Sequence, residues 1–424
     1  MKLILGFSIP LLFGNLFQQF YSMVDTMIVG RVLGTGPLAA VGSTGSITFL
    51  IIGFCLGLCS GFAIPVAQRF GSRDYKELRR FIGNAVWLCV GFGFVLTVLT
   101  VIFCRNILEL MGTPADIIDD AYAYLVVIFA GIPATFLYNM LAGIQRAIGD
   151  SRTPVVILVI ASIINIVLDI VLVVFIPMGV AGAAVATVAS QLIGGVVCLL
   201  YVSKHYEVLK MTREDFKINV PCIKRLLSMG LPMALQTSIT AIGSVILQAS
   251  VNSLGSTVVA SITAGSRLYM FFACAYDAMG VTMSTYSGQN IGARKIDRIG
   301  QGVKACNIVG IIYSVLALLI IVFLGKWMLL LFVDAGETAI INSAYWYLVC
   351  SGLFMIPLTF VNVLRLTIQG MGYSRLALFA GVFEMIARGG VGLFLVPLFG
   401  FNAACFSGPI AWILADSFLI PMYY

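Results

Sequence analysis

Charged side chains and histidine are scarce in this chain. Only 10% of its 424 residues are Asp, Glu, Lys or Arg, whereas soluble proteins average about a quarter, and His205 is the single histidine. The ten cysteines show no CxxC spacing. A metal centre, a bound cofactor or a histidine-dependent catalytic site is therefore not expected, and we predict that the protein is not an enzyme. The net charge of +7 does not indicate nucleic-acid binding, because the basic residues lie in loops between apolar runs.

Apolar residues dominate instead. They make up 60% of the chain and form separate runs of roughly 20 to 30 residues, the length that a tilted helix needs to cross a bilayer. We therefore predict an all-α integral membrane protein. Most Lys and Arg residues fall in alternate loops, which places both termini on the cytoplasmic side. The twelve spans are expected at residues 3–32, 38–67, 81–104, 117–145, 154–177, 179–203, 224–250, 257–288, 304–325, 338–368, 376–398 and 400–424.

The chain repeats itself about half its length apart. Residues 68–73 (QRFGSR) recur as residues 289–294 (QNIGAR), an offset of 289 − 68 = 221, and residues 133–136 (PATF) recur as residues 357–360 (PLTF). Duplicated halves are typical of secondary transporters, in which the two halves move against each other around a site near the bilayer midplane. Both halves keep the same orientation. The expected domains are an N-lobe at residues 1–203, a cytoplasmic linker at 204–223 and a C-lobe at 224–424.

Two acidic residues inside the expected spans lie at one depth. With a rise of about 1.5 Å per residue, Asp25 lies roughly 10 Å and Asp169 roughly 12 Å from the outer face. Tyr124 and Thr187 reach the same layer, and Asn165 lies one turn from Asp169 on the same helix face. Two carboxyl groups in a low-dielectric pocket both favour the neutral form. The first half therefore contains a candidate site that binds and releases a proton.

A structural role is the alternative for these two acids, with each carboxyl bonded to backbone at a helix irregularity. We favour ion coupling, because ionisable groups at membrane depth usually mark an ion pathway. In the second half, Glu384 and Arg388 are four residues apart on one span and are expected to form a structural charge pair. Packing or lipid contact is the alternative for each of the candidate substrate-cavity residues, which are Met23, Met27, Tyr269, Asp277 and Met283.

Several segments together resemble the multidrug and toxic compound extrusion (MATE) family. They are residues 24–26 (VDT), Asn165 with Asp169, residues 179–184 (GVAGAA) and residues 288–293 (GQNIGA). The resemblance covers essentially the whole chain. It implies a V-shaped pair of six-helix lobes in a prokaryotic plasma (inner) membrane, which exports organic cations and amphipathic drugs in exchange for protons or sodium. In prokaryotic members the first-lobe acids bind the coupling ion, and that pattern falls on Asp25, Tyr124, Asn165, Asp169 and Thr187.

One departure from the family pattern concerns the coupling ion. Some members carry a Glu in span seven and an Asp in span ten that are implicated in sodium binding, whereas this chain offers Gln236, Gln248 and Asn362 there. We therefore favour a proton-coupled antiporter acting as a monomer. A sodium-coupled exporter is one alternative. A flippase for lipid-linked precursors is a second alternative, although such a flippase is expected to need a strongly cationic central cavity, and this chain has few basic residues there.

Overall fold

The computed structural model describes residues 1–424, except the side chain of Thr35. Every regular element in this part of the chain is a helix. Nine helices of the described chain are long and apolar enough to cross a membrane, and eleven are if each of two bent helix pairs counts as one span. The last expected span, 400–424, is broken at Phe406 into two helices, of which the longer has 17 residues.

The chain divides into two compact units, which are described separately. The N-unit is Phe13–Ala234, and the C-unit is Leu235–Tyr424 together with Met1–Leu12. The unit boundary therefore falls within two long helices, α1 (Lys2–Val32) and α10 (Val220–Asn252), and not in the polar linker. Within the C-unit, the first turns of α1 are anchored by a hydrogen bond between the Ser8 and Thr282 hydroxyls (2.8 Å).

The N-unit is a bundle of helices around an apolar core. Phe62, Phe129 and Leu125 are fully buried in this core, where α3 packs along α7 and α9 packs along α6, α7 and α8. Besides its parts of α1 and α10, the unit contains α2 (Thr35–Ser43), α3 (Gly45–Gly71), α4 (Tyr75–Ile102), α5 (Cys104–Leu110), α6 (Ile118–Ala130), α7 (Ile132–Ala147), α8 (Arg152–Asp169), η1 (Ile170–Phe175), α9 (Val180–His205), η2 (Glu207–Leu209) and η3 (Arg213–Phe216).

Small residues let α3 and α10 approach closely within the N-unit. A Cβ added to Gly57 would lie 2.5 Å from the Cα of Ala234, and a Cβ on Gly61 would overlap the backbone at Gly230. Small residues four positions apart are typical of close helix packing in membranes. These glycines therefore serve the scaffold of the unit.

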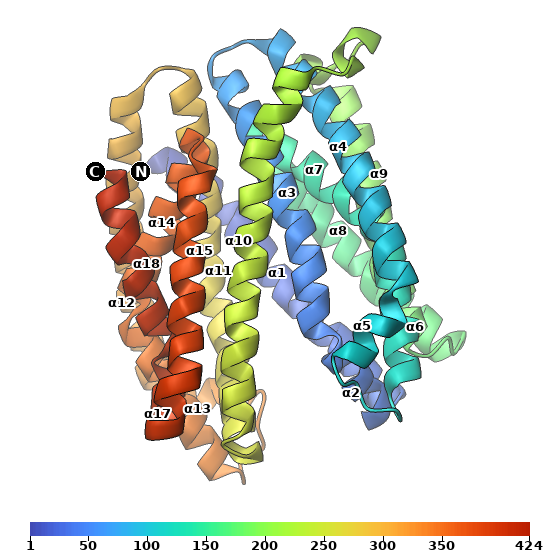
Figure 1. The fold of residues 1–424 in the computed structure, drawn as a ribbon, viewed down its shortest axis with the longest axis vertical. Coiled ribbons are helices and arrows are strands. Elements are labelled where there is room, and N and C mark those ends of the chain that lie inside the picture. The colour runs from blue at the N-terminus through green and yellow to red at the C-terminus, as the bar shows by residue number, and fades with distance from the viewer. The chain divides into compact units, whose positions relative to one another are not determined.

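The C-unit is a second bundle with its own core, in which Tyr276, Met283 and Ile321 are fully buried. Its α11 packs along α12, α13 and α14, and its α15 packs along α18 (Figure 1). Besides its parts of α1 and α10, the unit contains α11 (Ser256–Gly292), α12 (Ile296–Leu329), α13 (Thr338–Leu353), α14 (Met355–Met371), α15 (Ser374–Gly390), η4 (Val391–Leu395), α16 (Val396–Phe399), α17 (Phe401–Cys405) and α18 (Ser407–Tyr423).

The sequence repeat recurs in backbone detail. Arg73 and Arg294, 221 residues apart, are the non-glycine residues with positive φ (59° and 57°) in the described chain, and each follows the end of a corresponding helix. The helix pair α6–α7 is bent by 46° at Gly131, and α13–α14 by 54° at Phe354. A π-helix follows α8 in the N-unit and α15 in the C-unit. The two units are therefore built on one structural plan.

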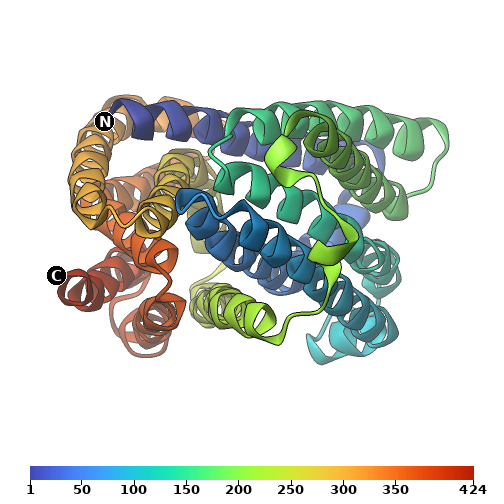
Figure 2. The same ribbon diagram turned by 90° about the horizontal axis from the view of Figure 1, so that it is seen from above.

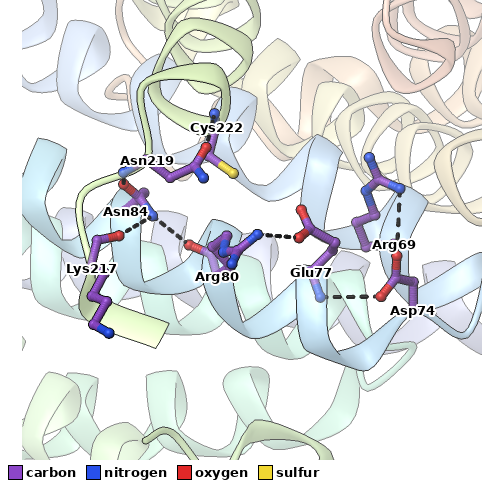
Figure 3. Close-up of polar contacts among 8 residues, drawn as sticks. All are labelled: Arg69, Asp74, Glu77, Arg80, Asn84, Lys217, Asn219 and Cys222. Carbon is purple, nitrogen blue, oxygen red and sulfur yellow. Dashed lines mark hydrogen bonds and ion pairs between the residues drawn. The ribbon is translucent and has the colours of Figure 1, made fainter. Parts of the chain in front are cut away.

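The linker after α9 is held against α4 by side-chain contacts. Asn84 is fully buried, donates to the carbonyl oxygen of Lys217 (3.3 Å) and accepts from the backbone N–H of Asn219 (2.8 Å) (Figure 3). Trp87 donates to the Phe216 carbonyl oxygen (2.9 Å), and Arg79 lies 3.6 Å from the Asp215 carboxylate. Seen from above, the linker crosses the ends of the N-unit helices (Figure 2). It is therefore an ordered part of this unit.

Replacing Asn84 with Ala is expected to loosen the linker. The change leaves the Asn219 N–H and the Lys217 carbonyl without their partner, at a cost of about 2 kcal/mol in unfolding free energy. Trypsin should then cut the linker faster at Arg213 and Lys217. Glu77→Gln is the control, because the Glu77–Arg80 pair (2.6 Å) is partly exposed and such pairs contribute little. Equal digestion rates for Asn84→Ala and wild type would show that these bonds do not hold the linker.

Candidate functional site

The N-unit brings two carboxyl groups together from helices that are distant in sequence. Asp25 comes from α1, and Asp169 is the last residue of α8. Their carboxyl groups lie within electrostatic range of each other. Two carboxyl groups so placed both favour the neutral form, because burial and like charge disfavour ionisation. The pair is therefore a candidate site for binding a proton.

This carboxyl pair lies among buried polar atoms without protein partners. Asp169 is fully buried, and Asn165, one turn earlier on α8, is 2% exposed. Within the described part of the chain, both carboxyl oxygens of Asp169, Oδ1 of Asp25 and both amide atoms of Asn165 have no hydrogen-bond partner. Such groups are rare inside proteins and call for an explanation such as a bound ion or water. Five of them in one place indicate a binding site.

The backbone beside Asp169 is irregular. The α-helix changes there to the π-helix η1, which runs over Ile170–Phe175. Gly179 follows with a positive φ of 64°, and the turn leads directly into α9. Single-turn π segments within α-helices occur frequently at functional sites, because they re-aim side chains at a small cost in hydrogen bonding. This irregularity places the Asp169 carboxyl at the junction of two helical geometries.

Tyrosines surround the carboxyl pair. Tyr124 from α6 and Tyr21 from α1 both lie within electrostatic range of Asp25 and Asp169. The sequence analysis identified Tyr124 but missed Tyr21, although Tyr21 lies one helical turn before Asp25. Thr187 on α9 is half-buried, and its hydroxyl donates to the Ala183 carbonyl oxygen (3.0 Å). The carboxyls, Asn165 and Tyr124 thus gather in one unit, whereas the Thr187 hydroxyl is engaged with its own helix.

The residues expected to line a substrate cavity have different surroundings. Met23 is half-buried and Met27 is exposed, both on the N-unit part of α1. In the C-unit, Asp277 is exposed and Tyr269 stacks on Trp412, with ring centroids 6.0 Å apart. Met283 differs from the expectation, because it is fully buried in the C-unit core and fills space between helices.

The structure places Glu384 of the C-unit between two arginines. Arg365 from α14 donates to Glu384 Oε1 at 3.0 Å, and Arg388 lies 4.0 Å from Glu384 Oε2. The expected Glu384–Arg388 pair is thus the longer of two contacts. Arg388 also donates to the Ser244 hydroxyl (2.8 Å). Arg365 does not extend toward water, because the carboxylate on the neighbouring helix provides a closer partner.

A second polar cluster lies where α7 turns into α8, beside a pocket of about 480 Å³. Asp150 accepts from the backbone N–H groups of Arg152 (2.9 Å) and Thr153 (3.0 Å) and from the Tyr206 hydroxyl. Burial raises the pKa of the Asp150 carboxyl, but the hydrogen bonds from Thr153 and Tyr206 outweigh burial and hold the pKa below its ordinary value of 3.8. This carboxylate is therefore ionised at neutral pH and ties the α7–α8 turn to the end of α9.

Removing the tyrosine hydroxyl is expected to weaken this tie in a pH-dependent way. Tyr206→Phe should lower the unfolding free energy by about 1 kcal/mol at neutral pH. A carboxyl whose pKa is depressed by folding stabilises the protein above its unfolded pKa, so the difference should shrink as the pH falls below 3.8. Unfolding temperatures in detergent across this pH range measure the difference. The exposed Tyr373 provides the control Tyr373→Phe, and a difference that persists at low pH would contradict the assignment.

Comparison with known proteins agrees with this architecture. A family model described as MatE matches residues 10–171 and again residues 232–393, two stretches offset by 232 − 10 = 222. The chain is 32% identical over 340 residues to a probable multidrug resistance protein of Bacillus subtilis, covering 78% of this chain and 73% of the relative. It is 26% identical over 307 residues to a protein named FAD transporter of Shewanella oneidensis, covering 71% and 67%.

The fold matches solved structures over nearly its whole length. One is an outward-facing multidrug resistance MATE family transporter of the MOP superfamily, with a TM-score of 0.93 and 22% identity over 99% of this chain and 94% of that one. The match confirms the predicted all-α, twelve-helix membrane fold. At this identity it bears on the fold alone.

Proposed function

Because the chain belongs to the MatE family of multi-pass membrane transporters, which are not enzymes, we propose that it is a proton-coupled antiporter that exports organic cations and amphipathic drugs. Proton binding at Asp25 and Asp169 in the outward-open state releases the substrate outside. Deprotonation toward the cytoplasm resets the transporter. No resident cofactor takes part in this cycle, and the coupling ion is the proton.

The proximity of the Asp25 and Asp169 carboxyls, whose buried oxygens lack hydrogen-bond partners among the described residues, carries this proposal. Such a pair changes its net charge by one when a single proton arrives or leaves. Asp25 lies on α1 and Asp169 at the π-helix η1, so that change acts on two backbone segments at once. Loss of the shared proton sets two negative charges against each other in a buried site, and one helix must shift to separate or hydrate them.

Adaptable side chains support a broad substrate range. Methionine and aromatic residues accommodate bulky apolar cations without strict geometry. Met23 and Met27 on α1, and Tyr269 and Asp277 on α11, are the candidate contacts. The name of the Bacillus relative, a probable multidrug resistance protein, supports the same substrate class.

Purified protein in liposomes tests the proposal directly. Efflux of a fluorescent organic cation is followed under an imposed pH gradient, an imposed sodium gradient, or neither. We expect efflux with the pH gradient alone and an opposite proton flux. Efflux driven by the sodium gradient would show that the coupling ion is sodium and not the proton. FAD serves as a second cargo because of the Shewanella relative, and transport of FAD without transport of the cation would overturn the substrate class.

A further inference from the structure

The C-unit contains a cluster of charged side chains that the proposed coupling site does not use. Arg365 and Arg388 both face Glu384, at 3.0 Å and 4.0 Å. Asp416 on α18 lies within electrostatic range of Glu384 and Arg365, and Asp277 on α11 within range of Arg365. The cluster therefore contains three carboxyl groups and two guanidinium groups. With all of them ionised its net charge is −3 + 2 = −1, so the binding of one proton makes the net charge zero.

This charged cluster occurs in the C-unit half of the repeat and has no charged counterpart in the N-unit half. At the offsets of 221 to 224 residues that relate the halves, the N-unit has uncharged residues in place of Asp277, Arg365, Glu384, Arg388 and Asp416. The N-unit thus builds the same helix packing with uncharged residues. Charges inside a membrane bundle are costly, and replacing a buried ion pair by apolar residues often leaves stability unchanged or higher. Packing of the C-unit does not explain why the charges are there.

The three acids differ in how they are compensated. Glu384 is 4% exposed and contacts both arginines. Asp277 is exposed and lies within electrostatic range of Arg365. Asp416 is only 7% exposed, and its Oδ1 is buried with no hydrogen-bond partner in the described part of the chain. An ionised carboxylate in that position has, among the described residues, no hydrogen bond at Oδ1 and no ion pair, only the charge of Arg365 within range, and a buried carboxyl so weakly compensated favours its protonated form.

We propose that Asp416 is a second proton-binding residue, located in the C-unit and separate from the Asp25–Asp169 pair. Glu384 is paired with two arginines, and the Asp416 carboxyl gains or loses the single proton that balances the cluster. Sodium is a poor occupant, because the fixed charge of Arg365 lies within range of the same carboxyl and repels a metal cation. This inference goes beyond the proposed function, which assigns coupling to the N-unit.

The surroundings of Asp416 contain few other groups that could account for a titration. Helix α18 packs against α13, α14, α15 and α17, and Tyr269 of α11 stacks on its Trp412. The charged or titratable groups on these helices are Arg365 on α14, Arg375, Glu384 and Arg388 on α15, Tyr345, Tyr347 and Cys350 on α13, Cys405 on α17, Tyr423 on α18, and Arg267, Tyr269, Cys274, Tyr276, Asp277 and Tyr286 on α11. The arginines keep their charge at all accessible pH values, so the carboxyls remain the candidates for proton exchange. The experiment therefore has to separate Asp416 from Glu384 and Asp277.

Infrared difference spectra of the reconstituted protein, recorded between acidic and alkaline pH without substrate, test the assignment. A protonated carboxyl has its own C=O stretch, separate from that of a carboxylate. We expect part of this band to disappear in Asp416→Asn and to persist in the double variant Asp25→Asn/Asp169→Asn. Asp416→Glu should keep the band at a shifted position, which excludes loss through misfolding. Glu384→Gln and Asp277→Asn serve as comparisons.

A band that is unchanged in Asp416→Asn would overturn the proposal, as would loss of the same component from the double variant Asp25→Asn/Asp169→Asn. Loss of the band on adding sodium chloride at constant pH, but not potassium chloride, would make the cluster a sodium site and overturn it as well. The infrared spectra report protonation and do not depend on transport activity. A protein that fails to export cations can thus still show the Asp416 band, and an active exporter can lack it.

Discussion

Asp169→Asn is expected to reduce pH-gradient-driven efflux to the level of liposomes without protein. Asp169 is fully buried and lies within electrostatic range of Asp25, so its protonation changes the charge of the pair. Asparagine has the same shape but cannot release a proton. Its amide can donate to the Asp25 carboxyl, so folding and membrane insertion should be preserved. The measurement is cation efflux and opposite proton flux in the same vesicles.

Asp119→Asn is the matched control for this prediction. It makes the same chemical change at an exposed carboxyl near the start of α6, 3.3 Å from Arg105. Efflux in this variant should equal that of wild type. Asp25→Asn should behave like Asp169→Asn, because either change removes the shared proton. Retention of pH-driven efflux in both variants would place the coupling group elsewhere, and Asp416 would then be the first residue to examine.

The position of the carboxyl pair could be predicted from the sequence because it depends on helix geometry alone. A constant rise per residue puts Asp25 and Asp169 at one depth, and the cost of charge in a membrane limits the candidates. The structure adds that the two carboxyls lie within electrostatic range of each other and that their buried oxygens lack hydrogen-bond partners among the described residues. It also adds Tyr21, which depth counting could have found one turn before Asp25 but did not, because tyrosine is common in membrane helices.

Helix irregularities could not be predicted in the same way. The bends at Gly131 and Phe354 and the π-helices after Asp169 and Gly390 all lie within apolar runs that read as continuous spans. The residue pattern of an apolar run does not mark such a break, because membrane helices tolerate breaks wherever the surrounding protein satisfies the freed backbone groups. The repeat does make them predictable in pairs. A break that is known in one half indicates a break about 221 to 224 residues away.

The surroundings of Glu384 show what periodicity alone leaves out for buried charges. Residues four apart on one helix are neighbours, which favoured Arg388. Within a bundle, a residue on the next helix can approach more closely, and Arg365 of α14 is 3.0 Å from Glu384 whereas Arg388 is 4.0 Å away. Local spacing thus identified a true neighbour of Glu384 and missed the shorter contact. Only the packing of α14 against α15 reveals it.

Arg365→Leu is expected to lower the unfolding free energy of the protein in detergent by about 3 kcal/mol. The arginine side chain is 19% exposed, donates to Glu384 and also donates to the Asn362 side chain (3.1 Å). Without it, the Glu384 carboxylate remains buried with only the 4.0 Å contact to Arg388. An uncompensated buried charge is much more costly than a missing apolar contact. The measurement is the unfolding temperature or denaturant midpoint in one fixed detergent.

The double variant Arg365→Leu/Glu384→Leu separates this explanation from simple loss of packing. If the cost arises from the unpaired carboxylate, removing that carboxylate as well should recover most of the stability, and the two changes should be strongly non-additive. Arg375→Leu controls for loss of a basic residue at an exposed position on α15. Equal losses in the single and double variants would mean that the arginine stabilises the C-unit through its contacts with Asn362 and its neighbours. The ion pair would then be incidental to the stability of this unit.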